Sequence, residues 1–284
     1  MEKKIILCAD STCDLSSELK EKYQVHCFPL HVLLEDKTYG DGYDLTPDDI
    51  FEAYRARKVL PKTAAVNTME YVDFCREWIE EGCDVLYINL ASGLSSSQNN
   101  CRLAAEELEG LYVVDSKNLS TGTGLLVLAA AERIAAGLPA AQIAQELNNL
   151  TSHVEASFVL DTLEFLYKGG RCSALAMMGA NMLQLKPCIE VNNTTGSMDV
   201  GKKYRGSLDK ALVQYVMDRL DGRTDIDTRR IFITHSGISA ERIEMVRAEV
   251  EKYQKFDEIF VTRAGCTISA HCGPNTLGIL FMTK

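Results

Sequence analysis

The sequence predicts an α/β protein of two domains with a ligand between them. Apolar runs of strand length alternate with segments of helical spacing through the first half of the 284-residue chain, a pattern typical of helix-covered, mostly parallel sheets. The second half contains a hairpin pattern over residues 187–204, which indicates antiparallel strands. At roughly 150 residues per domain, the length also fits two domains. We expect an N-terminal domain over residues 1–157 and a C-terminal domain over 158–284.

In the first half, each expected element is justified by its apolar spacing and its end signals. Thr46 followed by Pro47 predicts a helix start, because threonine caps helices and proline suits the first helical position. Gly137 separates two alanine-rich helices as a C-terminal cap. We expect a loop at 62–68 and a helix that ends at Gly82. The remaining strands are expected at 4–9, 25–34, 84–90 and 111–114, and the remaining helices at 14–23, 46–58, 96–108, 120–136 and 139–150.

The second half begins near residue 158 with a strand at 158–160. Two strands at 187–191 and 197–204 flank the turn 192–196, Asn-Asn-Thr-Thr-Gly. No linker rich in proline, glycine or serine separates the halves, so we expect them to pack closely and to share a cleft. The other expected elements are helices at 174–183, 207–220 and 240–253 and strands at 230–234, 258–262 and 277–282.

Charge and hydropathy exclude several functions. The 30 Lys and Arg residues against 40 Asp and Glu residues give a net charge of −10, which opposes sequence-independent binding to nucleic acid or anionic lipid. The longest apolar run, 125–131, is far shorter than the roughly 20 residues of a spanning helix, so no stable membrane insertion is expected. The first residues also lack the apolar stretch of a secretory signal. We therefore predict a cytoplasmic protein.

The ten cysteines predict buried, reduced thiols. They are spread along the chain without a CxxC motif. Cys266, His271 and Cys272 lie close together, but a zinc site needs a fourth ligand and another spacing. We predict neither a metal nor a cofactor.

Polar segments at the ends of strands are the candidate sites, because ligands of open α/β sheets bind there. The segment 92–98 has two interpretations. Ser95 and Gln98 have the spacing of a capping box, which needs no ligand. Alternatively, Gly93 lets the chain turn, and the Ser95 hydroxyl and the following helix N–H groups hold an anion. The other segments of this kind are 10–14, 61–63 and 265–274.

The histidines offer few candidates for chemistry. His26, His31 and His153 lie in strand or helix patterns, where a structural histidine is expected, and His235 is ambiguous. His271 is placed in a loop with neighbouring glycine and proline, where a site role and a structural role are equally supported. The chain has no G-x-S-x-G elbow and neither of the common nucleotide-binding glycine motifs.

Arg171 follows Gly169 and Gly170 and precedes the expected helix 174–183. Such an arginine is usually solvated, but this helix is rich in methionines. Methionines either fill a core or adapt to a flexible ligand. Both interpretations stay open.

Several motifs together resemble the DegV family of bacterial lipid-binding proteins. They occur in the family's order along nearly the whole chain: 10–15 (Asp-Ser-Thr-Cys-Asp-Leu), Pro61-x-Thr63, 92–95 (Ser-Gly-Leu-Ser), 114–116 (Val-Asp-Ser), 166–171 (Leu-x-Lys-Gly-Gly-Arg), Lys186-Pro187, and Gly265 to Pro274 with His271. The resemblance implies a protein that encloses one long-chain fatty acid. It also implies a binding subunit, not an enzyme, which presents the acyl carboxylate to a separate fatty acid kinase.

The resemblance also implies roles for individual residues. Thr63 and Ser95, with Ser96 beside it, match the positions of hydroxyls that bind the carboxylate, and His271 approaches from the second domain. Arg171 is expected to face the kinase. The family often has Ser-Gln where this chain has Ala64-Ala65, and Gly-Thr-Tyr where it has 96–98 (Ser-Ser-Gln), which leaves chain preference open.

Two other function classes are alternatives to lipid binding. A hydrolase or phosphotransferase could use Ser95 or His271 covalently. A DNA-binding regulator is disfavoured by the net charge and by the absence of a basic helix.

Overall fold

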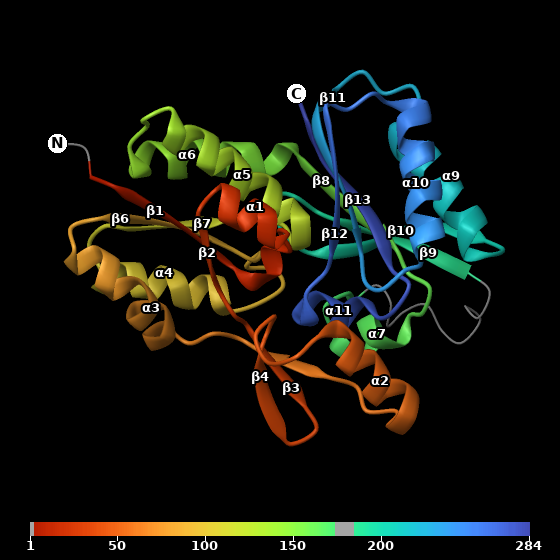
Figure 1. Ribbon diagram of the computed structural model, residues 1–284, viewed down its shortest axis with the longest axis horizontal. Helices are drawn as coiled ribbons and strands as arrows, with labels where there is room; N and C mark the ends of the chain where they lie inside the picture. Colours follow the sequence, from red (N-terminus) through yellow and green to blue (C-terminus); the bar gives the residue numbers. More distant parts are fainter. Residues whose placement is uncertain (1–2, 174–184) are drawn as a thin grey trace.

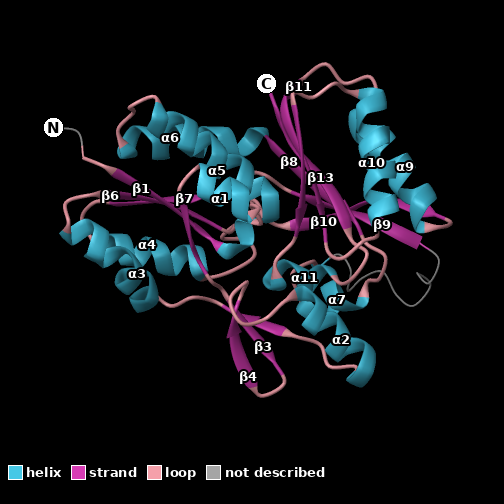
Figure 2. Cartoon of the chain, viewed as in Figure 1, coloured by secondary structure: helices cyan, strands magenta, loops and turns pink. Residues whose placement is uncertain are grey.

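The computed structural model describes residues 3–173 and 185–284 and confirms the predicted α/β fold class. Two sheets lie side by side with helices between and around them (Figures 1 and 2). The first sheet has four parallel strands in the order β2-β1-β6-β7, and the second has six strands in the order β10-β9-β8-β13-β11-β12. The N-terminal sheet is thus parallel, and the C-terminal sheet contains the predicted antiparallel pairs.

Helices cover both faces of the parallel sheet. In Figure 1, α3 and α4 lie below it, whereas α1, α5 and α6 lie above it. The central strands β1 and β6 are almost wholly buried and strongly apolar, as expected when both faces are covered. The elements are β1 (Ile5–Asp10), β2 (Val25–Phe28), β6 (Asp84–Asn89), β7 (Leu111–Asp115), α1 (Ser17–Lys22), α3 (Thr68–Glu80), α4 (Ser97–Glu107), α5 (Ser120–Ala135) and α6 (Ala140–Leu150).

The mixed sheet carries its helices α9 and α10 on the outer side (Figure 1). Its predicted hairpin is confirmed: β9 and β10 pair antiparallel on either side of the turn 192–196. Its elements are β8 (Val154–Val159), β9 (Leu185–Val191), β10 (Met198–Arg205), β11 (Ile226–His235), β12 (Glu258–Arg263), β13 (Leu277–Thr283), α9 (Leu208–Leu220) and α10 (Ala240–Tyr253).

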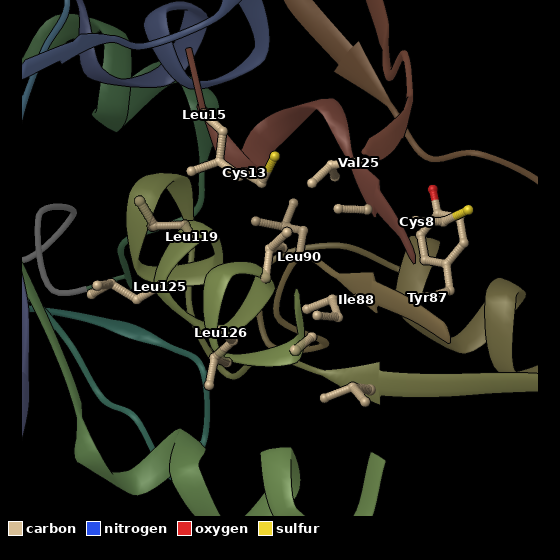
Figure 3. Close-up of a cluster of buried hydrophobic side chains, with 14 of the residues drawn as sticks. Cys8, Cys13, Leu15, Val25, Tyr87, Ile88, Leu90, Leu119, Leu125 and Leu126 are labelled. Carbon is tan, nitrogen blue, oxygen red and sulfur yellow. The ribbon is translucent and has the colours of Figure 1, made fainter. Parts of the chain in front are cut away.

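Helix α5 joins the two sheets because it packs against both. It contacts β1 and β6 of the parallel sheet and β8, β11 and β13 of the mixed sheet. Small residues permit this close packing; a Cβ on Gly124 would lie 2.8 Å from the carbonyl oxygen of Cys13. Leu119, Leu125 and Leu126 belong to the resulting core (Figure 3). The main hydrophobic core is therefore continuous between the halves.

A third sheet departs from the expected elements. The expected strand 25–34 breaks at Pro29, so that β2 stays in the parallel sheet while β3 (His31–Leu34) pairs with β4 (Lys37–Gly40) and β5 (Lys62–Ala64). The loop expected at 62–68 thus begins with a strand. These strands and α2 (Pro47–Arg57), which has the predicted Thr46 cap, pack on α7 (Glu164–Gly169) and α11 (Cys266–Cys272). Segments from the N-terminal half of the chain therefore pack against two helices from its C-terminal half and hold them in place.

The expected domain boundary and the expected start of the first C-terminal strand differ from the observed elements. The division after residue 157 falls inside β8, so the two-domain boundary stays a prediction. Strand β8 begins earlier than the expected 158–160 because residues from Val154 onward pair with β13. The helix expected at 174–183 lies outside the described residues. Within the described chain, no helix has both the length and the apolar character to cross a membrane.

Candidate functional site

A cavity of about 260 Å³ lies between the two halves and brings together every residue that the sequence singled out for the ligand. Thr63 comes from β5, Ser95 and Ser96 from the loop before α4, His271 from α11, and Arg171 from the segment after α7. The rest of the described lining is mainly apolar: Leu30, Ala64, Ala65, Leu90, Leu94, Leu119, Leu166, Met198, Ile268 and Cys272, with Thr267 as a further hydroxyl.

A buried carboxylate fixes the start of the loop between β6 and α4. The backbone N–H of Leu90 donates to Asp10 at 2.8 Å, and the hydroxyls of Tyr71 and Tyr87 donate to the same carboxylate at 3.0 and 3.1 Å. Asp10 is completely buried, and this burial raises its pKa. The segment 10–14 therefore supports the site without lining the cavity.

The capping box of Ser95 and Gln98 is not formed. Helix α4 has Ser96 as its N-cap residue, without a side-chain cap bond. The Ser95 Oγ instead accepts from the N–H of Ser97 at 3.2 Å and donates to the Ser97 hydroxyl at 3.0 Å. The Ser95 side chain borders the cavity, and its hydroxyl can turn its proton from Ser97 to the oxygen of a ligand carboxylate, which only accepts hydrogen bonds; Ser96 is exposed on the rim.

Gly93 has a different role from the one expected. Its backbone is not in the left-handed region, so it is not required for a turn. A Cβ at this position would lie 2.7 Å from the carbonyl oxygen of Thr195 in the β9–β10 turn. Gly93 is therefore needed for close contact between the loop and the mixed sheet.

Thr63 and His271 meet across the two halves of the chain. The Thr63 Oγ1 lies 2.9 Å from His271 Nε2, and β5 holds Thr63 through its pairing with Val32. If the imidazole donates from Nε2, the Thr63 hydroxyl proton is free to donate to a ligand oxygen. The pair can therefore supply a hydrogen bond to a carboxylate.

His271 is held neutral and close to glycine backbone. Burial, followed by the positive charge of Arg171, lowers the pKa of His271 to about 4. Its Nδ1 is buried with no hydrogen-bond partner among the described residues, and a Cβ on Gly169 would lie 2.3 Å from that atom. Gly169 thus makes the space that the ring occupies.

The prediction of a loop around His271 is wrong, because His271 lies near the end of the short helix α11. Two carboxylates from the first half hold the beginning of this helix. Asp41 accepts from the N–H groups of Cys266 at 2.6 Å and Thr267 at 3.3 Å, and Asp14 accepts from Gly265 at 2.8 Å. These bonds fix the helix that carries His271.

Arg171 lines the cavity and is also accessible to solvent. It is exposed, and its guanidinium donates to the carbonyl oxygen of Gly169 at 2.6 Å. Its position combines a cavity contact with accessibility from outside.

The other histidines make local contacts that account for them. His31 bonds Glu70 at 2.8 Å, and His26 packs on the Trp78 ring. His235 accepts from the N–H of Gly237, and burial lowers its pKa to about 4. The nine cysteines other than Cys172 are reduced thiols, and no group of metal-binding side chains is found in residues 3–173 and 185–284.

Two further hydroxyls at the site, those of Ser97 and Thr267, were not predicted from the sequence. Ser97 is completely buried, and its Oγ accepts from the N–H of Val66, which ties the Ser95 loop to the segment after Thr63. Thr267 lines the cavity, and its buried Oγ1 has no partner among the described side chains and backbone groups. Thr267 was not predicted because it lies in the first turn of α11, a helix that the sequence predicted as a loop.

Comparisons with known proteins agree with this architecture. A family model described as "Uncharacterised protein, DegV family" matches residues 4–284. A DegV domain-containing protein from Deinococcus radiodurans is 31% identical, with 97% of each chain covered.

Solved structures give the same result. A fatty-acid-binding DegV family protein from Thermus thermophilus has a TM-score of 0.88 at 30% identity, covering 99% of this chain and 100% of the other. DegV of Bacillus subtilis, a fatty acid binding protein, has a TM-score of 0.81 at 26% identity, with full coverage of both chains. A stearic-acid-binding protein from Eubacterium ventriosum has a TM-score of 0.83 at 25% identity, covering 99% and 98%. The chain therefore belongs to the DegV family.

Proposed function

We propose that the protein binds one long-chain fatty acid in the cavity between its sheets and presents the carboxylate to a separate fatty acid kinase. The single observation that carries the proposal is the polarity of the cavity. Hydroxyls of Thr63 and Ser95 and the imidazole of His271 border a cavity that is otherwise mainly apolar. The fatty acid binding of structurally similar DegV proteins supports the same ligand class.

The apolar lining supplies the affinity. Each buried CH₂ group contributes about 0.8 kcal/mol, so a long acyl chain gains far more from the lining than the headgroup gains from any one hydrogen bond. Leucines from the loop before α4, from the residue that precedes α5 and from α7 line this space. The hydroxyls then orient the carboxylate at one end.

Mass spectrometry of an organic extract tests the ligand. We expect one fatty acid per protein, and rebinding of a labelled fatty acid after delipidation. An extract without fatty acid, together with no binding by the folded delipidated protein, would refute the proposal.

The headgroup assignment is tested with Thr63→Ala and Ser95→Ala. Losing a hydrogen bond to a charged group costs about 1.5–3 kcal/mol, so each variant should bind roughly tenfold to a hundredfold more weakly. Ser92→Ala is the matched control, because Ser92 is exposed in the same loop and does not line the cavity. Wild-type affinity in a folded Thr63→Ala/Ser95→Ala variant would contradict the assignment.

The kinase partnership depends on Arg171 in this proposal. A guanidinium at the cavity rim can pair with a carboxylate or with the acyl phosphate formed from it. Arg171→Ala should retain the fatty acid but form acyl phosphate more slowly with the partner kinase and ATP. Unchanged turnover at limiting protein would remove Arg171 from this role.

The alternative is a hydrolase or phosphotransferase. Its nucleophile and base would need to meet, but Ser95 bonds Ser97, and His271 bonds Thr63. Hydrolysis of acyl esters by the purified protein alone would favour the alternative, whereas retention of unmodified fatty acid favours the binding function.

A further inference from the structure

Two thiols approach one another outside the cavity. The Sγ atoms of Cys13 and Cys27 lie 3.7 Å apart. Cys13 ends the short turn η1 (Ser11–Cys13), which follows β1, and Cys27 lies on β2, the neighbour of β1. The turn folds the chain back so that residues 14 positions apart bring their sulfurs together.

The two cysteines have different surroundings. Cys13 is completely buried, whereas Cys27 is partly exposed. The hydrogen bond with Cys13, assisted by the charge of Lys20, lowers the pKa of Cys27, and the same contact raises the pKa of Cys13. By contrast, burial raises the pKa of the Cys75 thiol to about 12. Thiolates, not thiols, attack oxidants, so Cys27 is the better nucleophile.

We propose that Cys13 and Cys27 form a dithiol site that hydrogen peroxide oxidises reversibly to a disulfide. The Cys27 thiolate attacks one peroxide oxygen, the O–O bond breaks, and the departing hydroxide takes up a proton as water. Cys27 is then a sulfenic acid. The Cys13 sulfur attacks the Cys27 sulfur, the S–O bond breaks, and the hydroxyl leaves with the Cys13 proton as a second water. Two thiols lose two electrons in total, and one peroxide is reduced to two waters.

The disulfide needs a small local movement. A disulfide has sulfurs about 2.05 Å apart, so the present separation of 3.7 Å must shorten by about 1.6 Å. Residue Asp14, next to Cys13, accepts from the N–H of Gly265 at the start of α11. The bond would therefore form in the turn that holds α11.

Peptide mapping under non-reducing conditions tests the site. The protein is treated with hydrogen peroxide, its remaining thiols are alkylated, and it is cleaved after lysine and before aspartate. Cleavage after lysine gives peptides 5–20 and 23–37, and cleavage before Asp10 separates Cys8 from Cys13. We expect a Cys13–Cys27 cross-link that dithiothreitol removes.

Three variants sharpen the test. Cys13→Ser should leave Cys27 as a sulfenic acid that dimedone captures, and Cys27→Ser should lower the rate of peroxide consumption by about tenfold. Cys83→Ser is the control: at 9% exposure Cys83 is the most exposed of the buried cysteines, and its loss should leave the cross-link unchanged. Wild-type protein whose Cys27 stays reduced, or becomes a sulfinic acid without a bond to Cys13, would overturn the proposal. This mapping of the wild type decides the question even if a variant does not fold.

Discussion

Helices α4 and α11 both begin at the cavity side of the molecule, but their first N–H groups have different partners. The start of α11 is filled by carboxylates of the protein itself, because Asp41 accepts from two of its N–H groups and Asp14 from the N–H of Gly265. The start of α4 has no acidic residue in its first turn, and the N–H of Ser97 is met by a neutral hydroxyl.

The difference distinguishes a structural helix start from one suited to a ligand. A helix N-terminus has a partial positive charge that favours an anion. At α11 the first N–H groups already have acceptors within the protein, so Asp14 and Asp41 act as a tether between the halves of the chain. At α4 an external carboxylate can occupy the same electrostatic position beside Thr63.

The largest effect is expected for Asp41→Ala. The change leaves the N–H groups of Cys266 and Thr267 and the Ser11 hydroxyl without their acceptor. Each unpaired buried group costs about 1–3 kcal/mol, so the free energy of unfolding should fall by about 3–5 kcal/mol. Urea denaturation measures this loss. Asp36→Ala, in an exposed turn, should change stability by less than about 0.5 kcal/mol; equal losses in both variants would show that Asp41 is no tether.

Ser95→Asp converts the α4 start to the α11 arrangement. The new carboxylate should take the place of the ligand carboxylate and repel it, weakening fatty acid binding by about a hundredfold, or about 2.7 kcal/mol. The same charge should stabilise the ligand-free protein by about 0.3–1 kcal/mol through the helix dipole. Fluorescent fatty acid titration and thermal unfolding measure the two effects.

Ser92→Asp places the same charge in the same loop outside the cavity and should leave fatty acid affinity within about twofold. If Ser95→Asp binds fatty acid as tightly as Ser92→Asp, the α4 start does not hold the carboxylate.

These contrasts show which parts of the site a sequence can predict. Alternation of strands and helices predicted the sheets, and Thr46-Pro47 predicted the start of α2 because capping is a local property. The DegV resemblance predicted Thr63, Ser95 and His271 as neighbours, and the structure does place them at one cavity.

The parts that escaped prediction depend on distant contacts. The third sheet forms because β3 pairs with β5, whose three residues are too short to give a periodic signal. Helix α11 needs Asp14 and Asp41, more than 200 residues away, to fill its N–H groups. The closeness of Gly169 to His271 likewise requires tertiary packing between α7 and α11.

Gly169→Ala tests the other end of α11. A methyl group 2.3 Å from His271 Nδ1 forces the ring to move away from Thr63. Overpacking of this kind costs about 1–3 kcal/mol of unfolding free energy, and fatty acid affinity should fall with it. Lys168→Ala is the control, because Lys168 is exposed and lies beside Gly169 on α7.

A second substitution isolates the cause. In Gly169→Ala/His271→Ala the collision is gone, so the stability loss should be at least about 1 kcal/mol smaller than the sum of the two single losses. Additive losses would mean that Gly169 matters for a reason other than the imidazole.

The last effect, similar in size to that of Gly169→Ala, concerns the pH dependence of the α11 tether. Burial, followed by the neighbouring Asp41 carboxylate, raises the pKa of Asp14 to about 7, whereas an unfolded aspartate titrates near 3.9. Between these pH values the folded protein keeps a proton that the unfolded chain has lost. The contribution of Asp14 to stability is therefore complete below about pH 4 and lost as the pH rises through about 7.

Asp14→Asn removes this titration while keeping an oxygen that can accept from Gly265. The amide can also donate to the Ser120 oxygen, which at present donates to the carboxylate. Urea midpoints from pH 4 to 8 should therefore show a wild-type unfolding free energy that falls relative to the variant by about 1–3 kcal/mol as the pH rises. Neutral His271 and His235 contribute the opposite slope in both proteins, so only the difference between wild type and variant reports Asp14. A difference that is constant with pH would show that Asp14 is ionised throughout.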